Sequence, residues 1–201
     1  MIAIIDYGMG NLRSVQKAFQ YIGCEALLTR DAAQIAAASH VVLPGVGAFG
    51  DAMDNLRALD LIAPIHDAVR SGRPFLGICV GLQLLFEESE EMGRHAGLGI
   101  FPGKVVQLRI SGKVPHIGWN QIHRKKESPL LAGLPEDGFA YFVHSYYAVP
   151  TDPSLVLATT DYEIDFLSVA GRQNVFGIQF HPEKSQDNGL RILKNFAEMV
   201  G

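Results

Sequence analysis

Short apolar runs alternate with amphipathic segments over the first half of the chain. Residues 2–5 and 41–43 are unbroken apolar runs, which are typical of strands buried on both faces of a sheet. Between such runs, apolar residues recur every three or four positions, as in a helix that buries one face. The pattern predicts strands at 2–5, 26–28, 41–43 and 75–78, and helices at 12–21, 32–38, 49–59 and 61–70. Strands that alternate with helices predict a parallel sheet covered on both faces.

The pattern changes after residue 86. Acidic residues and glycines crowd the segment 87–103, which predicts a loop. Strand-like segments without intervening helices follow at 105–108, 118–123, 139–143, 146–149, 155–160, 166–169 and 175–180. Such segments favour antiparallel hairpins, and an apolar stripe in 189–200 predicts a closing helix. The predicted fold is α/β, with an open, mixed, mostly parallel sheet, helices on both faces and a C-terminal half rich in antiparallel hairpins.

The composition adds limits to this picture. The chain has 201 residues, of which 48% are hydrophobic and 19% charged, and it shows no repeat or linker, so we expect one domain over 1–201. A formal net charge of −4 gives no overall electrostatic footprint for nucleic acid or an anionic membrane. No run of 18 apolar residues and no secretory leader is visible. We therefore expect a cytoplasmic protein with neither a nucleic-acid nor a membrane partner.

Two cysteines and seven histidines complete the inventory of reactive residues. Two cysteines are too few for a disulfide framework, and a reducing compartment suits a working thiol. The histidines lack the close spacing of a zinc site. We expect no metal and no cofactor.

Cys79 lies between two glycines where the strand predicted at 75–78 ends. A strand that turns abruptly into a helix lifts one side chain clear of the sheet, as in a nucleophile elbow. Gly77 and Gly81 would permit the close backbone approach of so sharp a turn. The loops at 8–10 and 45–50 also follow strands and should reach the same sheet edge. A lone cysteine can equally be a small buried hydrophobic residue, so the nucleophile hypothesis needs support from elsewhere.

That support comes from a histidine and a glutamate two positions apart. The apolar strand predicted at 175–180 runs out into His181 and Glu183, and residues two apart in extended chain face the same side. Pro182 should open the strand into a loop. By themselves the two side chains could simply be a solvated strand end. At the same sheet edge as Cys79, they suit a general base and its orienting carboxylate.

A thiol, a histidine and a carboxylate of this kind perform acyl transfer on an amide or an ester. The reaction also needs an oxyanion hole of backbone N–H groups, each worth about 2.7 to 4 kcal/mol. The loop at 44–47, through Val46, would supply one donor, and the N–H of Val80 would supply another. Alone, the loop could be a plain turn.

Three segments together resemble the class I glutamine amidotransferases, namely 44–49, 77–83 and 179–184. Within that class, the segments 6–12, 118–120 and 142–146 closely resemble the glutaminase subunits of imidazole glycerol phosphate synthases, which belong to histidine biosynthesis. The resemblance spans nearly the whole chain and implies a flavodoxin-like core.

The resemblance also implies a reaction. Cys79 would attack the side-chain amide of glutamine, ammonia would leave, and water would hydrolyse the glutamyl thioester. His181 would transfer the protons and Glu183 would orient it. Residues implied to hold glutamine are Gly47, Gln83, Glu91, Ser145 and Tyr146.

A separate subunit completes the implied enzyme. Ammonia would pass to a (β/α)8 cyclase subunit in a heterodimer, which makes imidazole glycerol phosphate and aminoimidazole carboxamide ribotide. Glutaminase activity would stay low until that partner is loaded, with a mobile 45–46 peptide completing the oxyanion hole. The docking face would include Asn11, Trp119, Tyr141 and Lys184. Trp119 could otherwise be a core residue, and Lys184 a solvated one.

Two other hypotheses remain. The chain could be a glutaminase for another synthase, such as one making anthranilate or pyridoxal phosphate, but the segments 7–11 and 118–120 argue against it. It could also be a catalytically silent regulatory subunit. The presence of Cys79, His181 and Glu183 together argues against that.

Overall fold

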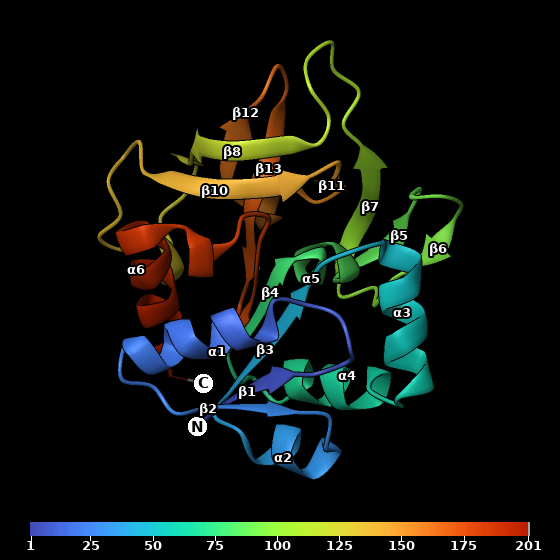
Figure 1. The fold of residues 1–201 in the computed structure, drawn as a ribbon, viewed down its shortest axis with the longest axis vertical. Coiled ribbons are helices and arrows are strands. Elements are labelled where there is room, and N and C mark those ends of the chain that lie inside the picture. The colour runs from blue at the N-terminus through green and yellow to red at the C-terminus, as the bar shows by residue number, and fades with distance from the viewer. Residues whose placement is uncertain (201) are drawn as a thin grey trace.

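The computed structural model of the chain describes residues 1–200. Its largest sheet is a mixed sheet of eight strands (Figure 1). The strand order is β2-β1-β3-β4-β14-β13-β12-β9. The parallel strands are β1 (Ile2–Ile5), β2 (Ala26–Thr29), β3 (His40–Gly45), β4 (Phe75–Cys79) and β14 (Val175–Ile178). The antiparallel strands are β13 (Asp165–Arg172), β12 (Val156–Asp161) and β9 (His123–Arg124). The predicted mixed α/β fold is thus confirmed.

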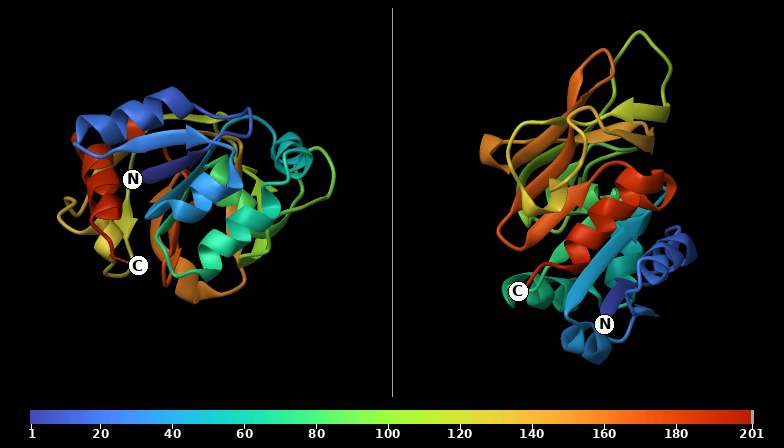
Figure 2. Two further views of the ribbon diagram at one scale, coloured as in Figure 1. Left: turned by 90° about the horizontal axis from the view of Figure 1, so that it is seen from below. Right: turned by 90° about the vertical axis from the view of Figure 1, so that its left-hand side faces the viewer.

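Helices cover both faces of the parallel part. On one face α1 (Leu12–Tyr21) packs against α6 (Gln186–Ala197), and on the other α2 (Ala32–Ala37) packs against α4 (Ile62–Arg70) (Figure 2). Helix α3 (Phe49–Ala58) contacts the short α5 (Val80–Leu84). Every residue of β1, β3 and β4 is buried, as expected for strands covered from both sides. No helix within residues 1–200 is long and apolar enough to cross a membrane.

Two smaller sheets stand above the carboxyl ends of the parallel strands (Figure 1). One pairs β8 (His116–Gln121) with β10 (Phe139–His144), and the other has the order β11-β7-β5-β6. Its strands are β5 (Phe86–Ser89), β6 (His95–Ala96), β7 (Phe101–Gln107) and β11 (Tyr146–Pro150). Single 3-10 turns are η1 (Pro129–Leu131), η2 (Pro153–Leu155) and η3 (Pro182–Lys184).

The prediction of a loop over 87–103 was wrong, because β5 and β6 lie there and β7 begins there. The glutamates that suggested a loop have partners outside their own strand. Glu88 pairs with Arg94 at 2.6 Å, and Glu87 accepts a 2.9 Å hydrogen bond from the backbone N–H of Gly103. Pairing with β7 satisfies the backbone of β5. Such charges therefore say little about secondary structure until the partners are known.

The turn at Cys79 is as sharp as the sequence suggested. Cys79 has φ 56° and ψ −112°, a conformation that is rare for a residue with a side chain. A Cβ on Gly77 would press on the backbone of Gly81, and a Cβ on Gly81 would overlap the carbonyl oxygen of Leu43. Gly45 lies beside Cys79 in the register of β3 and β4. Glycine is therefore required here for space.

Replacing Gly81 by alanine should destabilise the fold by about 3 kcal/mol, because the new methyl group meets backbone that cannot rotate away. Gly72→Ala is the matched control, since Gly72 has φ +83° with open space around it and should cost only about 1 kcal/mol. Urea unfolding of both variants measures the difference. Equal midpoints would contradict the packing argument.

Candidate active site

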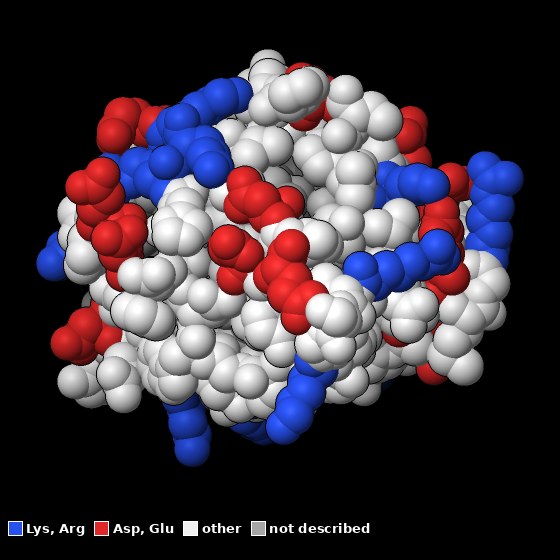
Figure 3. All heavy atoms as spheres, turned by 90° about the horizontal axis from the view of Figure 1, so that it is seen from above, with Lys and Arg blue, Asp and Glu red and all other residues white. Residues whose placement is uncertain are grey.

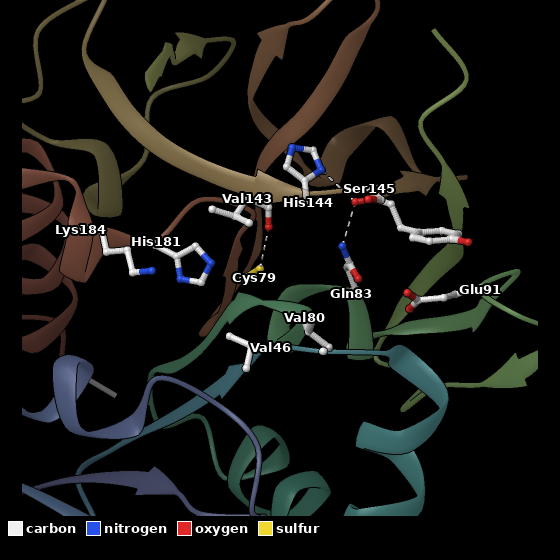
Figure 4. Close-up of a pocket in the computed structure, with 12 residues that line it drawn as sticks. Val46, Cys79, Val80, Gln83, Glu91, Val143, His144, Ser145, His181 and Lys184 are labelled. Atoms are coloured by element: carbon white, nitrogen blue, oxygen red, sulfur yellow. Dashed lines mark hydrogen bonds between the residues drawn. The ribbon is translucent and has the colours of Figure 1, made fainter. Parts of the chain in front are cut away.

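Cys79 sits at the junction of β4 and α5, at the floor of a cavity of about 290 Å³ (Figure 4). The side chain is buried, and its Sγ lies 3.9 Å from both the carbonyl oxygen of Val143 and the Nε2 of Gln179. Val143 lies on β10 and lines the cavity, whereas fully buried Gln179 contacts the sulfur from the segment just after β14. The thiol is therefore held between the two halves of the chain.

His181 and Glu183 face Cys79 from the turn that follows β14. His181 Nδ1 lies 2.9 Å from Glu183 Oε1, and both side chains are almost fully buried. Their proximity was predicted, but the strand that was expected to produce it ends at Ile178. The 3-10 turn η3 instead brings Glu183 back onto the imidazole, and the backbone N–H of His181 is anchored on the carbonyl oxygen of Tyr141 at 2.9 Å.

The electrostatics of His181 differ from those of an ordinary buried histidine. Burial alone would lower its pKa, but the neighbouring Cys79 and Glu183 side chains raise that pKa to about 10. The hydrogen bond from Nδ1 to Glu183 leaves Nε2 for the sulfur. The imidazole can therefore hold a proton beside a thiolate and release it to a leaving group.

The predicted oxyanion donors lie on the opposite wall. Val46 and Val80 both line the cavity, one from the end of β3 and the other from the first turn of α5 (Figure 4). The first N–H groups of a helix have no partner inside it. Gly47 has φ +87°, a conformation that favours glycine, and it too lines the cavity. The loop after β3 therefore forms part of the cavity wall.

All five residues expected to hold glutamine line the same cavity, namely Gly47, Gln83, Glu91, Ser145 and Tyr146. The amide nitrogen of Gln83 donates to the carbonyl oxygen of Tyr146 at 2.9 Å and to Oε1 of Gln179 at 3.1 Å. Glu91 Oε2 accepts a 2.7 Å hydrogen bond from the N–H of Phe49, the first residue of α3. Its other oxygen stays available to the cavity.

The four residues expected at a partner interface gather at one edge of the site. Trp119 and Tyr141 pack edge to face at 5.9 Å between ring centroids, and the Nζ of Lys184 lies 5.8 Å from the Tyr141 ring. Trp119 is 45% exposed and so is not a core residue. Asn11 donates a 3.2 Å hydrogen bond to Glu183 Oε1, which ties this edge directly to the carboxylate.

Sequence reasoning missed the contributions of Val143, His144 and Gln179. Val143 and His144 line the cavity, and buried Gln179 bridges Gln83 and Cys79. Each lies in a segment that carried the family resemblance, which was the available signal. Among residues 1–200, no three His, Cys, Asp or Glu side chains gather as a metal site would require.

Known proteins resemble this chain over its whole length. The family model of class-I glutamine amidotransferases matches residues 3–200. Imidazole glycerol phosphate synthase subunit HisH of Syntrophotalea carbinolica is 57% identical over 206 residues, covering 99% of this chain and 100% of that protein. The subunit HisH of Aquifex aeolicus is 56% identical over 194 residues, covering 96% of this chain and 94% of its own length.

A solved structure gives independent support for the fold. The structure titled PurLQS from Thermotoga maritima superposes with a TM-score of 0.78 over 98% of this chain and 96% of that chain. At 18% identity it speaks for the fold alone. The family model and the close relatives leave no ambiguity about membership: this chain belongs to the class-I glutamine amidotransferase family.

Proposed function

We propose that this chain is the glutaminase subunit of an imidazole glycerol phosphate synthase, hydrolysing glutamine to glutamate and ammonia. The observation that carries the proposal is the cavity in which Cys79 faces a histidine paired with a buried carboxylate. The high identity to relatives named as subunits of that synthase selects it over other synthases.

The chemistry follows from the three side chains. The Cys79 thiolate attacks the side-chain amide carbon of glutamine, and protonated His181 delivers its proton to the departing nitrogen. Ammonia leaves and a glutamyl thioester remains. Neutral His181 then takes a proton from water, which attacks the thioester and releases glutamate. Glu183 keeps the imidazole oriented throughout, from 2.9 Å on Nδ1.

Backbone groups stabilise the tetrahedral intermediates. The N–H groups of Val46 and Val80 would donate to the oxyanion, each contributing about 2.7 to 4 kcal/mol. Val46 follows the last residue of β3 and is 38% exposed, so a movement of the 45–46 peptide would begin where the strand ends. We propose that this movement completes the oxyanion hole when the partner is loaded, which keeps the activity of the free subunit low.

The remaining lining residues suit the charged α-carbon end of glutamine. The free oxygen of Glu91 can accept the α-ammonium group. Gly47, Gln83, Ser145 and Tyr146 enclose the rest of the substrate. We assign these five residues to glutamine binding.

The partner proposed for this subunit is a (β/α)8 cyclase that uses ammonia to make imidazole glycerol phosphate and aminoimidazole carboxamide ribotide. Strands β8 and β10 expose the apolar residues Ile117, Trp119 and Phe139, at 60%, 45% and 48%. Seen from above, this end of the molecule carries small groups of both charge signs around uncharged surface (Figure 3). An apolar patch with a mixed polar rim suits a protein partner in a heterodimer. Asn11, Tyr141 and Lys184 would join Trp119 in the contact.

We further propose that residues 1–201 act as one amidotransferase domain in the cytoplasm. One continuous core of buried side chains links both halves of the described chain. Cys24 and Cys79 are both free thiols, as a reducing compartment favours.

Replacing Cys79 by alanine should abolish glutamine-dependent product formation by the reconstituted synthase, because no thioester can form. Product formation from added ammonium salt should persist, since the cyclase subunit is untouched. Cys24→Ala is the matched control and should keep both activities. Equal loss with both nitrogen sources would contradict the assignment of Cys79 as the nucleophile.

Replacing Glu183 by glutamine should lower the pKa of His181 from about 10, because one of the interactions that raise it is removed. Glutaminase kcat in the complex should fall by about 10²- to 10⁴-fold. Histidine ring NMR across pH 6 to 10 follows the titration. The raised folded-state pKa of His181 contributes stability that is fully present below about pH 6.5 and is lost as the pH rises through about 10. The free energy of unfolding should therefore depend less on pH in the variant.

Glu198→Gln serves as the control for that experiment, since Glu198 is exposed and pairs only with Lys194. It should leave the His181 titration and kcat unchanged. An unaltered His181 titration in Glu183→Gln would argue against the orienting role.

Replacing Trp119 by alanine should weaken coupling to the cyclase subunit, because an exposed aromatic side chain is removed from the proposed interface. Tyr21→Ala, at the far end of α1 and 79% exposed, is the control. Titrating glutaminase activity with the cyclase subunit measures the effect. Identical titration curves for the two variants would place the interface elsewhere.

A further inference from the structure

Two buried histidines lie side by side on the β8–β10 pair: His144 on β10 lines the cavity, and His116 on β8 lies behind it. His116 Nδ1 is 3.0 Å from His144 Nε2. The exposed fraction is 3% for His116 and 6% for His144. His116 is stacked between the rings of Phe142 and Tyr162, at 5.0 and 4.0 Å between centroids. Burial lowers the pKa of His116 to about 4 and that of His144 to about 3. Both rings are therefore neutral at pH 7.

The hydrogen bonds around these rings require one tautomer of each. His144 Nδ1 lies 2.9 Å from the carbonyl oxygen of Tyr146, which can only accept, so Nδ1 carries the proton. His144 Nε2 must then accept from His116 Nδ1. His116 Nε2 is left to accept from the amide nitrogen of Asn120 at 3.3 Å. All four ring nitrogens have a hydrogen-bond partner. The donors and acceptors run in one order, from Asn120 through His116 and His144 to the Tyr146 carbonyl oxygen.

Further polar contacts connect the Tyr146 carbonyl oxygen to Cys79. The carbonyl oxygen of Tyr146 also accepts from Gln83, whose amide nitrogen donates in turn to Gln179. The amide nitrogen of Gln179 lies 3.9 Å from the sulfur of Cys79. The dashed lines in Figure 4 mark the hydrogen bonds of His144 and Gln83 to the carbonyl oxygen of Tyr146. A continuous set of polar contacts thus runs from β8 to Cys79.

The alternation of β8 connects this set to the outer surface. Trp119 is exposed, whereas His116 and Asn120 point inward. Asn120 also donates a 2.8 Å hydrogen bond to the carbonyl oxygen of Asp161, which braces β8 against the main sheet. Trp119 and Asn120 are neighbours on opposite faces of β8, so the outer face and the hydrogen-bonded series share this strand.

We propose that His116 and His144 are positioning residues that couple the outer face of β8 to the glutamine cavity, by holding the Tyr146 carbonyl and through it Gln83. This inference rests on the proposed function for the identity of the substrate and of the partner. Apolar side chains would fill the same space without the desolvation that a buried polar pair requires. A buried polar pair in which every ring nitrogen has a partner suits a role in transmitting position.

The spectroscopic test uses the wild-type chain alone. Nitrogen-15 NMR of the histidine rings at pH 7 should show His116 and His144 neutral and protonated on Nδ1, although free histidine favours the Nε2 proton. Either ring carrying its proton on Nε2, or a charge, would overturn the proposal. This measurement requires no variant to fold.

The functional test uses His116→Phe and His144→Phe in the complex with the cyclase subunit. His116→Phe should reduce the activation of glutaminase by the loaded partner at least tenfold, because the donor to His144 Nε2 is removed. His144→Phe should raise the KM for glutamine at least tenfold, because the Tyr146 carbonyl oxygen loses one of its two donors and Gln83 is held less firmly. His144→Asn, which keeps a donor near the position of Nδ1, should restore much of the KM.

His66→Phe is the matched control, because His66 lies on α4 far from β8 and should change neither quantity. The proposal would be overturned if the cyclase subunit activated the His116→Phe variant as strongly as wild type and the His144→Phe variant kept a wild-type KM for glutamine. Failure of the proposed function looks different: the wild-type chain itself would then show no activation by the cyclase subunit, and the ring tautomers alone would decide the positioning role.

Discussion

The close approach of three backbone segments around Cys79 is the constraint on which the rest of the site depends. Cys79 adopts a positive φ that costs about 1 to 3 kcal/mol. The parallel pairing of β3 and β4 and the side-chain-free Gly81 keep the turn in place. Because the strain is borne by the core of the main sheet, the sulfur is presented at one point with little freedom to move.

A second constraint is electrostatic, and it separates the histidines of the site into two kinds. His181 is buried next to a carboxylate and a thiol, so its charged form is favoured. Burial disfavours the charged forms of His116 and His144 and lowers their pKa values, and the charge of nearby His181 acts in the same direction on His144. We propose that the first kind moves protons and that the second holds neighbouring groups in position. The same residue type thus serves chemistry on one wall of the cavity and geometry behind another.

The antiparallel half of the chain joins these constraints. Strand β10 carries the carbonyl oxygen that contacts Cys79 and the one that anchors His181. Its partner β8 exposes Trp119 on the other side. Asn11, from the first loop of the chain, bonds directly to Glu183. The surface proposed for docking and the groups proposed for catalysis are therefore separated by a single layer of backbone.

Local pattern by itself determined four of the parallel strands and the turn at Cys79, because unbroken apolar strands, helical spacing and paired glycines are short-range signals. It also paired His181 with Glu183. The strand β14 was expected in an antiparallel hairpin, but it also pairs parallel with β4, a long-range contact that no local pattern shows. The strand β5 could not be found, because its glutamates have their partners, the Arg94 side chain and the Gly103 backbone N–H, outside the strand. Nor could the set of contacts from Asn120 to Cys79, since each member lies on a different segment. Hydrogen-bond direction between distant side chains exists only once the tertiary structure has placed both partners.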